Sequence, residues 1–162
     1  MTRKVFMIAL AVLLSLAGLA SAEELKSIKL ADSPYSLMIP ASFVNGEVND
    51  TDRSEGLTAY YKSDATTLDF DVYQISSKSG SLAEFAAEDA KAFDGKDIIT
   101  DSEINGVKVA SYRSRQKDEG TEYDVISYVF GGGDGKYIRL NFWLDGENAE
   151  AGTKAIINSL SK

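Results

Sequence analysis

Two carboxylates stand two residues apart in the segment LDFDVYQIS, as Asp69 and Asp71. Because side chains alternate along a β-strand, this spacing places both carboxylates on one face of a strand. Together with Asp52 or Asp64 they offer the oxygen ligands that a hard cation such as calcium prefers. Acids that alternate along a strand also keep a sheet edge soluble, and no EF-hand spacing surrounds these two. We therefore expect a solvated strand face without a metal, and keep cation binding there as the alternative.

Paired carboxylates can also hydrolyse glycosides, which requires an acid with a raised pKa beside an ionised partner. The chain has 25 acidic residues, so such pairs arise by chance. It has no histidine and no cysteine. That absence removes serine-histidine-acid triads, cysteine nucleophiles, and zinc or haem sites built on thiolate or imidazole. We therefore expect neither an enzyme nor a cofactor, and keep a carboxylate-dependent hydrolase as an alternative.

A run of glycines, GGGDG at residues 131–135, precedes Lys136 and resembles a phosphate-binding loop in composition. A phosphate loop needs G-x-x-x-x-G-K followed by Ser or Thr. Phe130 stands where the first glycine belongs, and Tyr137 follows the lysine. Strand-like residues on both sides predict a hairpin turn instead.

The segment after this turn, KYIRLNFWL at residues 136–144, offers a candidate binding surface. On a strand, Tyr137, Arg139 and Trp143 share one face. Tryptophan and arginine are enriched at binding hot spots, so these three residues form a candidate ledge for a ligand or a partner. We favour the other interpretation, that the C-terminal helix covers Trp143, because something must close that face of the sheet.

The elements that position these residues follow from alternation, turn signals and one capping box. Ser81 and Glu84 form the capping box of a helix that we expect Gly95 to close as the left-handed residue, and a second helix begins near Glu147. Polar residues 41–56 predict a long exposed loop. The expected strands span residues 25–31, 35–39, 57–62, 68–75, 98–104, 107–114, 123–130 and 137–144.

Tight hairpins such as Asn105-Gly106 make neighbouring strands antiparallel. Both faces of the later strands carry apolar side chains, which requires cover on two sides. The sequence therefore predicts an α+β fold: a mostly antiparallel sheet of about seven strands, with helices packed on its two faces.

The first 22 residues have the pattern of a secretory signal peptide: Arg3 and Lys4, an apolar run, and Ala20-Ser21-Ala22 as a cleavage site. We expect residues 1–22 to be the signal peptide and 23–162 a single α+β domain, secreted or periplasmic. Cleavage removes two bases and moves the formal charge from −8 to −10. Such a charge disfavours nucleic acid, and the lack of cysteine removes a lipid anchor, so we expect no stable membrane attachment.

Several segments together resemble the Mog1/PsbP-like family: YSLMIPASF, LDFDVYQIS, SLAEFAAEDAKAF, INGVKVASYRSR and EYDVISYVFGGGDGKYIRLNFWL, followed by a closing helix. The resemblance spans nearly all of residues 23–162. It implies an α/β/α sandwich with a mostly non-catalytic role, such as docking on a larger assembly, and an exported bacterial member of unsettled role. It carries no catalytic motif, so it assigns no site residue.

These observations predict an exported, non-enzymatic binding or docking domain that acts on a protein or a cell-envelope component. A sheet face or residues 41–56 would form the contact. The alternative is a small-molecule or glycan binder that uses the aromatic ledge around Trp143.

Overall fold

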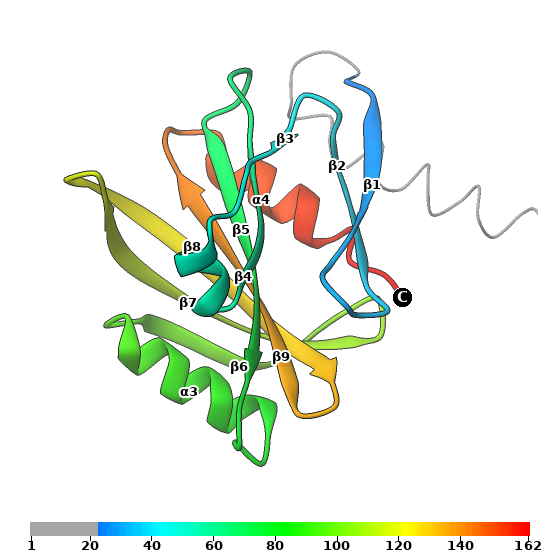
Figure 1. Ribbon diagram of the computed structural model, residues 1–162, viewed down its shortest axis with the longest axis vertical. Helices are drawn as coiled ribbons and strands as arrows, with labels where there is room; N and C mark the ends of the chain where they lie inside the picture. Colours follow the sequence, from blue (N-terminus) through cyan, green and yellow to red (C-terminus); the bar gives the residue numbers. More distant parts are fainter. Residues whose placement is uncertain (1–22) are drawn as a thin grey trace, which may run out of the picture.

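The computed structural model describes residues 23–162, which form nine strands and three helices (Figure 1). The expected signal peptide, residues 1–22, lies outside the described residues. The strands are β1 (Leu25–Lys29), β2 (Ser36–Pro40), β3 (Val44–Asn45), β4 (Leu57–Lys62), β5 (Leu68–Ser76), β6 (Lys96–Ile104), β7 (Val107–Asp118), β8 (Thr121–Gly133) and β9 (Lys136–Leu144). The helices are α2 (Asp50–Ser54), α3 (Leu82–Ala92) and α4 (Ala149–Ile157).

Seven strands form one antiparallel sheet in the order β3-β4-β5-β9-β8-β7-β6, and β1 pairs with β2 in a separate hairpin. The predicted α+β class with an antiparallel sheet is therefore confirmed. The strand β9 lies between β5 and β8 and pairs with both, so residues about 70 positions apart along β5 and β9 become neighbours. This long-range pairing brings Asp69 and Asp71 beside Trp143.

Two of the predicted hairpins turn on residues with positive φ. Asn105 and Gly106 have φ of 49° and 81°, and Asp134 and Gly135 have φ of 50° and 71°. Left-handed backbone at both central positions is the geometry of a tight hairpin that matches strand twist. The glycine run thus ends β8 and turns into β9, as predicted, with a register shift between Gly131 and Gly133.

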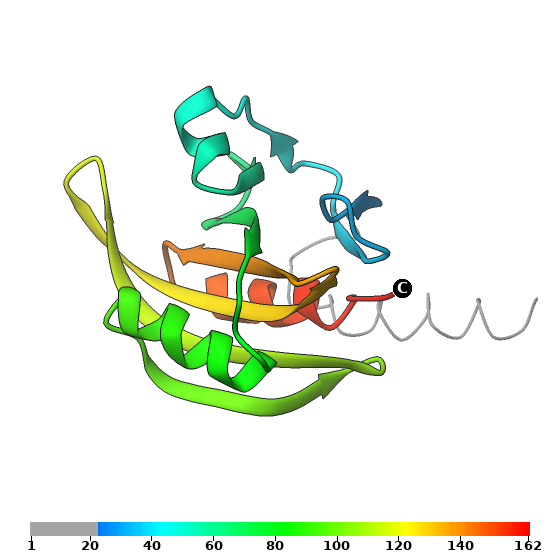
Figure 2. The same ribbon diagram turned by 60° about the horizontal axis from the view of Figure 1, so that its bottom comes forward.

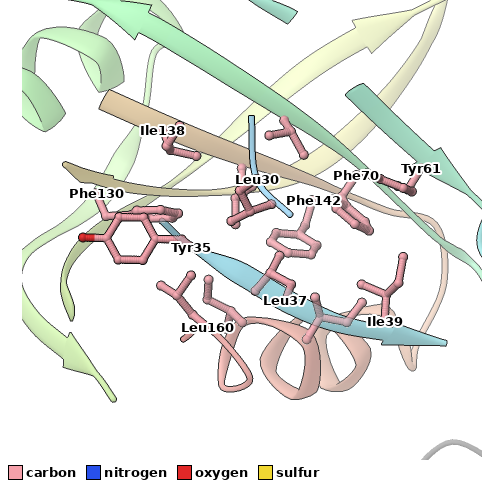
Figure 3. Close-up of a cluster of buried hydrophobic side chains, with 14 of the residues drawn as sticks. Leu30, Tyr35, Leu37, Ile39, Tyr61, Phe70, Phe130, Ile138, Phe142 and Leu160 are labelled. Atoms are coloured by element: carbon pink, nitrogen blue, oxygen red, sulfur yellow. The ribbon is translucent and has the colours of Figure 1, made fainter. Parts of the chain in front are cut away.

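One face of the sheet, called the α4 face below, is closed by α4 and by the β1–β2 hairpin (Figure 3). Phe70 and Phe142 stack across the β5–β9 pair with ring centroids 5.2 Å apart. Burial of such aromatic and aliphatic side chains is the main stabilising contribution to the fold. The cluster includes Leu30, Leu37, Ile39, Tyr61, Phe70, Phe130, Ile138, Phe142 and Leu160.

The opposite face, called the α3 face below, is closed in part by α3, which packs on β6, β7 and β8. Ser81 caps the helix by accepting the Glu84 backbone N–H at 3.2 Å. The Glu84 carboxylate accepts the N–H of Gly80 at 2.7 Å, one residue before the position that a capping box predicts. Phe85, Ala86 and Ala90 form the buried stripe of the helix. The two helices therefore lie on opposite faces of the sheet, as predicted (Figures 1 and 2).

The prediction of a long exposed loop over residues 41–56 is wrong in part, because this segment contains β3 and the short helix α2. The Asn49 side chain caps α2 by accepting the Asp52 backbone N–H at 2.9 Å. A polar run favours irregular structure, although Asn followed by acidic residues is also typical of a helix start.

The predicted role of Gly95 as the left-handed residue after α3 is also wrong. Asp94 takes that conformation, with φ of 50°. Gly95 is needed for space instead, because a Cβ there would lie 2.8 Å from the Tyr112 ring and 2.9 Å from the Ala90 carbonyl oxygen.

Within residues 23–162, no helix has the length and apolar character required to cross a bilayer.

Candidate functional site

A cavity of about 600 Å³ opens on the part of the α3 face that α3 leaves uncovered. Its floor is formed by β5 and β9, and its walls come from α2, β4 and the tip of the β7–β8 hairpin. Figure 2 shows this hairpin curving away from the plane of the sheet, towards the side on which α2 lies. We call this hollow the acidic cavity, because six carboxylates line it: Asp52, Asp69, Asp71, Asp118, Glu119 and Asp145.

The floor of the acidic cavity contains a hydrogen bond between two neighbouring strands. The indole Nε1–H of Trp143 donates to the Asp71 carboxylate at 2.6 Å. Trp143 pairs with Asp69 in the β5–β9 register, so its indole reaches diagonally along the sheet to Asp71. The bond fixes the orientation of the tryptophan ring and of the carboxylate.

Burial raises the pKa of Asp71 to about 6. The hydrogen bond from Trp143 and the positive charge of Arg139 oppose this rise, while the negative charges of Asp69 and Asp118 add to it. Burial also raises the pKa of Asp69, although less. The acidic cavity therefore destabilises the ionised form of its own floor carboxylate.

Aromatic rings complete the walls of the acidic cavity: Tyr60, Tyr73, Tyr123 and Trp143 line it. Tyr123 meets Trp143 edge to face, with ring centroids 6.0 Å apart. The Tyr60 ring lies against the backbone of Gly46, where an added Cβ would come within 1.8 Å of its Cζ atom. Gly46 thus allows Tyr60 to take its place in the wall.

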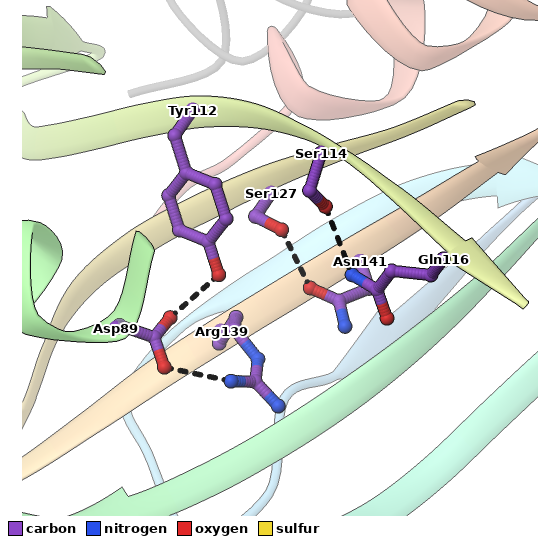
Figure 4. Close-up of polar contacts among 7 residues, drawn as sticks. All are labelled: Asp89, Tyr112, Ser114, Gln116, Ser127, Arg139 and Asn141. Carbon is purple, nitrogen blue, oxygen red and sulfur yellow. Dashed lines mark hydrogen bonds and ion pairs between the residues drawn. The ribbon is translucent and has the colours of Figure 1, made fainter. Parts of the chain in front are cut away.

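Beside the acidic cavity, a buried polar cluster joins α3 to the sheet (Figure 4). Asp89 of α3 receives hydrogen bonds from Arg139 at 2.7 Å and from the Tyr112 hydroxyl at 2.8 Å. The Arg139 guanidinium also lies 4.3 Å from the Tyr73 ring centroid and 4.7 Å from that of Phe93. Because Tyr73 also lines the acidic cavity, this cluster and the cavity share a wall.

The three residues predicted to form a ledge share one face of β9, but only Trp143 lines the acidic cavity. Tyr137 stacks on Phe85 of α3 with ring centroids 4.1 Å apart. Arg139 is 6% exposed and paired with Asp89. The helix α3 covers both, so they support the site rather than form a ledge with Trp143.

The expectation that the C-terminal helix covers Trp143 is wrong. The helix α4 packs on the opposite face, among the residues that alternate with Trp143 along β9. Trp143 is half-buried by its neighbours in the acidic cavity.

Sequence reasoning did not identify Tyr60, Tyr73 or Tyr123 as wall residues. These tyrosines lie on three different strands, and only the order of strands in the sheet brings them together. The aromatic residues of these segments predict β-strands, but they do not indicate which of the strands meet around a cavity.

The carboxylates of the acidic cavity are spread around its walls. No group of three or more acidic side chains in the described part of the chain is placed to hold a metal ion. The arrangement suits a ligand larger than a single ion.

No known protein family matches the sequence, and no curated protein matches it either. A crystal structure from Bacteroides thetaiotaomicron is similar in fold, with a TM-score of 0.52 and 16% sequence identity. The match covers 78% of this chain and 44% of that chain, so this chain spans less than half the length of that protein. At this identity the similarity concerns the fold alone.

Proposed function

We propose that this protein is a non-enzymatic binding domain that holds a small molecule in the acidic cavity. The observation that carries the proposal is the hollow of about 600 Å³ with aromatic walls and a hydrogen-bonded polar floor. Ligand sites in proteins have volumes of about 300 to 1,000 Å³ and combine aromatic walls with a few convergent polar groups. The cavity thus favours the small-molecule alternative over docking on a partner.

The hydrogen bonding of Asp71 supports binding rather than turnover. Among residues 23–162, its side-chain hydrogen-bond partner is the Trp143 indole. A hydrolase with two carboxylates needs an acid and a partner with separate roles at a fixed distance. An indole that orients a single carboxylate instead suits recognition of a ligand.

The architecture supports a further proposal, that the chain is a distant Mog1/PsbP-like protein. Its helices lie on opposite faces of an antiparallel sheet, which agrees with the sandwich that the resemblance implies. Export to the periplasm or the medium is part of the same proposal and rests on the pattern of residues 1–22.

Tryptophan fluorescence tests the binding proposal directly, because Trp143 is the only tryptophan in the chain. We expect at least one member of a set of cationic, neutral and anionic metabolites to change the emission in a saturable manner. The same compound should raise the melting temperature, since a ligand that binds only the folded state stabilises it. A set without any such compound would contradict the proposal.

Docking on a protein partner is a second candidate, favoured by the outer strand β6. Ile98 and Ile99 on this edge are 43% and 50% exposed. An edge strand whose outer side is unpaired, and which carries apolar side chains, can pair with a strand of another chain. A partner recovered from envelope extracts by the native protein, but not by an Ile98→Lys variant, would support docking.

A further inference from the structure

The acidic cavity concentrates carboxylates that form no ion pair within the described residues. Its charged lining residues carry six carboxylates and one ammonium group, that of Lys62. The five ion pairs formed within residues 23–162 involve none of the six carboxylates. Elsewhere on the α3 face the buried carboxylate of Asp89 has its own arginine. The carboxylates of the cavity therefore lack a paired cation such as Arg139 provides for Asp89 in the neighbouring cluster.

The aromatic walls add a second attraction for positive charge. Tyrosine and tryptophan rings bind ammonium and guanidinium groups over their faces. The same sheet face already provides an example, since the Arg139 guanidinium lies between the rings of Tyr73 and Phe93. Tyr73 and three further rings line the cavity. A site in which carboxylates lie among aromatic rings is suited to bind an organic cation.

The composition of the lining disfavours the other ligand classes. An anion would meet six carboxylates, and a single metal ion would not find three of them together within residues 23–162. A neutral sugar could use the hydroxyl groups of the lining, but it would bring no positive charge to the six carboxylates. A chain of spaced positive charges can instead contact several separated carboxylates at once.

We propose that the acidic cavity binds an organic polycation whose ammonium groups are spaced along a flexible chain, with the Asp71 carboxylate as the central counter-charge. The inference rests on the proposed function and names the ligand class of the same cavity. Such a cation is available either as a free polyamine or as the side chains of a lysine-rich peptide, and both share the same recognition chemistry. The volume of about 600 Å³ favours the free polyamine.

The surroundings of Asp71 give the binding a pH dependence. Asp69 and Tyr73 lie beside it on β5, Arg139 and Trp143 face it from β9, and Asp118 faces it from the β7–β8 hairpin. Its pKa of about 6 in the free protein means that the carboxyl is partly protonated at mildly acidic pH. A bound cation lowers this pKa, so binding releases a proton and weakens as the pH falls below about 6.

Calorimetric titration of the purified protein with spermidine tests the proposal. Trilysine, a neutral trisaccharide and citrate serve as parallel probes, each at low and at physiological salt. We expect saturable binding of spermidine at one site, stronger than that of trilysine, which distinguishes the two sources of the cation. We also expect affinity about tenfold weaker for Asp71→Asn, because the counter-charge is lost while the shape remains.

A matched control separates the cavity from the general negative charge of the surface. Asp101→Asn removes one carboxylate from the exposed edge strand β6, outside the cavity, and we expect it to bind spermidine as the native protein does. Asp118→Asn with Glu119→Gln changes two exposed cavity residues at the tip of the β7–β8 hairpin, and we expect weaker binding. The indole N–H resonance of Trp143 should shift during each successful titration.

Three results would overturn the inference. Equal losses in Asp71→Asn and Asp101→Asn would mean that spermidine binds only to the surface charge. Binding of the trisaccharide or citrate without spermidine would refute the cation and leave the proposed function intact. A Trp143 resonance that none of the probes, nor any compound of the wider metabolite set, perturbs would remove both proposals.

Discussion

The Arg139 guanidinium on β9 is joined to the Asp89 carboxylate on α3 by an ion pair 2.7 Å long. The two side chains are 7% and 9% exposed, so the pair is shielded from solvent. The Tyr112 hydroxyl donates to the other oxygen of Asp89. This cluster links α3 to two strands of the sheet beside the acidic cavity.

Removing Asp89 should destabilise the protein strongly. An Asp89→Asn variant leaves the buried Arg139 charge without its partner, which costs about 3 to 5 kcal/mol. Urea unfolding followed by far-UV circular dichroism would measure the loss. The matched control is Asp124→Asn, which breaks the exposed pair with Arg115 and should cost less than about 1 kcal/mol. If the free energy of unfolding fell by similar amounts in both variants, the buried Arg139–Asp89 pair would stabilise the protein no more than an exposed pair does.

Replacing Asp71 should remove a pH-dependent penalty on stability. The folded pKa of about 6 lies above the ordinary value of 3.8, so the folded state holds the proton more tightly than the unfolded state. Stability from this group is therefore greatest below pH 3.8, falls as the pH rises to about 6, and stays reduced above it.

In Asp71→Asn we expect no decrease in stability from this position between acidic and neutral pH. Near neutral pH, the free energy of unfolding of the variant should exceed that of the native protein by on the order of 2 kcal/mol. Urea titrations at about pH 4 and about pH 7.5 would measure the difference between variant and native protein. Equal native and variant profiles at both pH values would show that Asp71 ionises without penalty.

Adding a methyl group at Gly46 should disturb the acidic cavity without changing any of its lining residues. A Cβ at this position would lie 1.8 Å from the Tyr60 ring, so the ring must leave its place in the wall. We expect Gly46→Ala to weaken spermidine binding several-fold. Gly131→Ala is the control, because a Cβ there meets no atom within 4 Å. Unchanged affinity in Gly46→Ala would mean that Tyr60 makes no contact with the ligand.

Metal chelation should leave stability unchanged. The described carboxylates do not gather in groups that could hold an ion, so we expect EDTA to shift the melting temperature by less than about 1 °C. Differential scanning calorimetry with EDTA and then with excess calcium would measure the shift. A decrease of several degrees with EDTA that calcium reverses would contradict this prediction and favour the alternative of a cation bound at Asp69 and Asp71.

The elements that could be predicted from the sequence are those defined by neighbours in the chain. Ser81 with Glu84 located the start of α3, and Asn105-Gly106 located a hairpin, because each signal acts within a few residues. Alternation along β9 placed Trp143 and Arg139 on one face for the same reason. The short helix α2 was missed, since its single capping residue was indistinguishable from turn chemistry.

The acidic cavity could not be predicted, because its parts meet only through the order of strands. The β5–β9 pairing brings Asp71 to Trp143, and the curvature of the β7–β8 hairpin brings Asp118 towards them. The partner of Arg139 was missed for a related reason. Asp89 was one of many acids in the sequence, and only the packing of α3 on the sheet selects it.

The floor and the rim of the acidic cavity are built on different kinds of structure. Asp71 and Trp143 belong to strands inside the sheet, whereas Asp52 lies on a short helix and Asp118 and Glu119 lie at the hairpin tip. Rim side chains can be exchanged without repacking the interior, because none of them is buried. The molecule is therefore a natural starting scaffold for engineering: lysines at the rim would redirect the hollow towards anions, while the framework beneath it kept its shape.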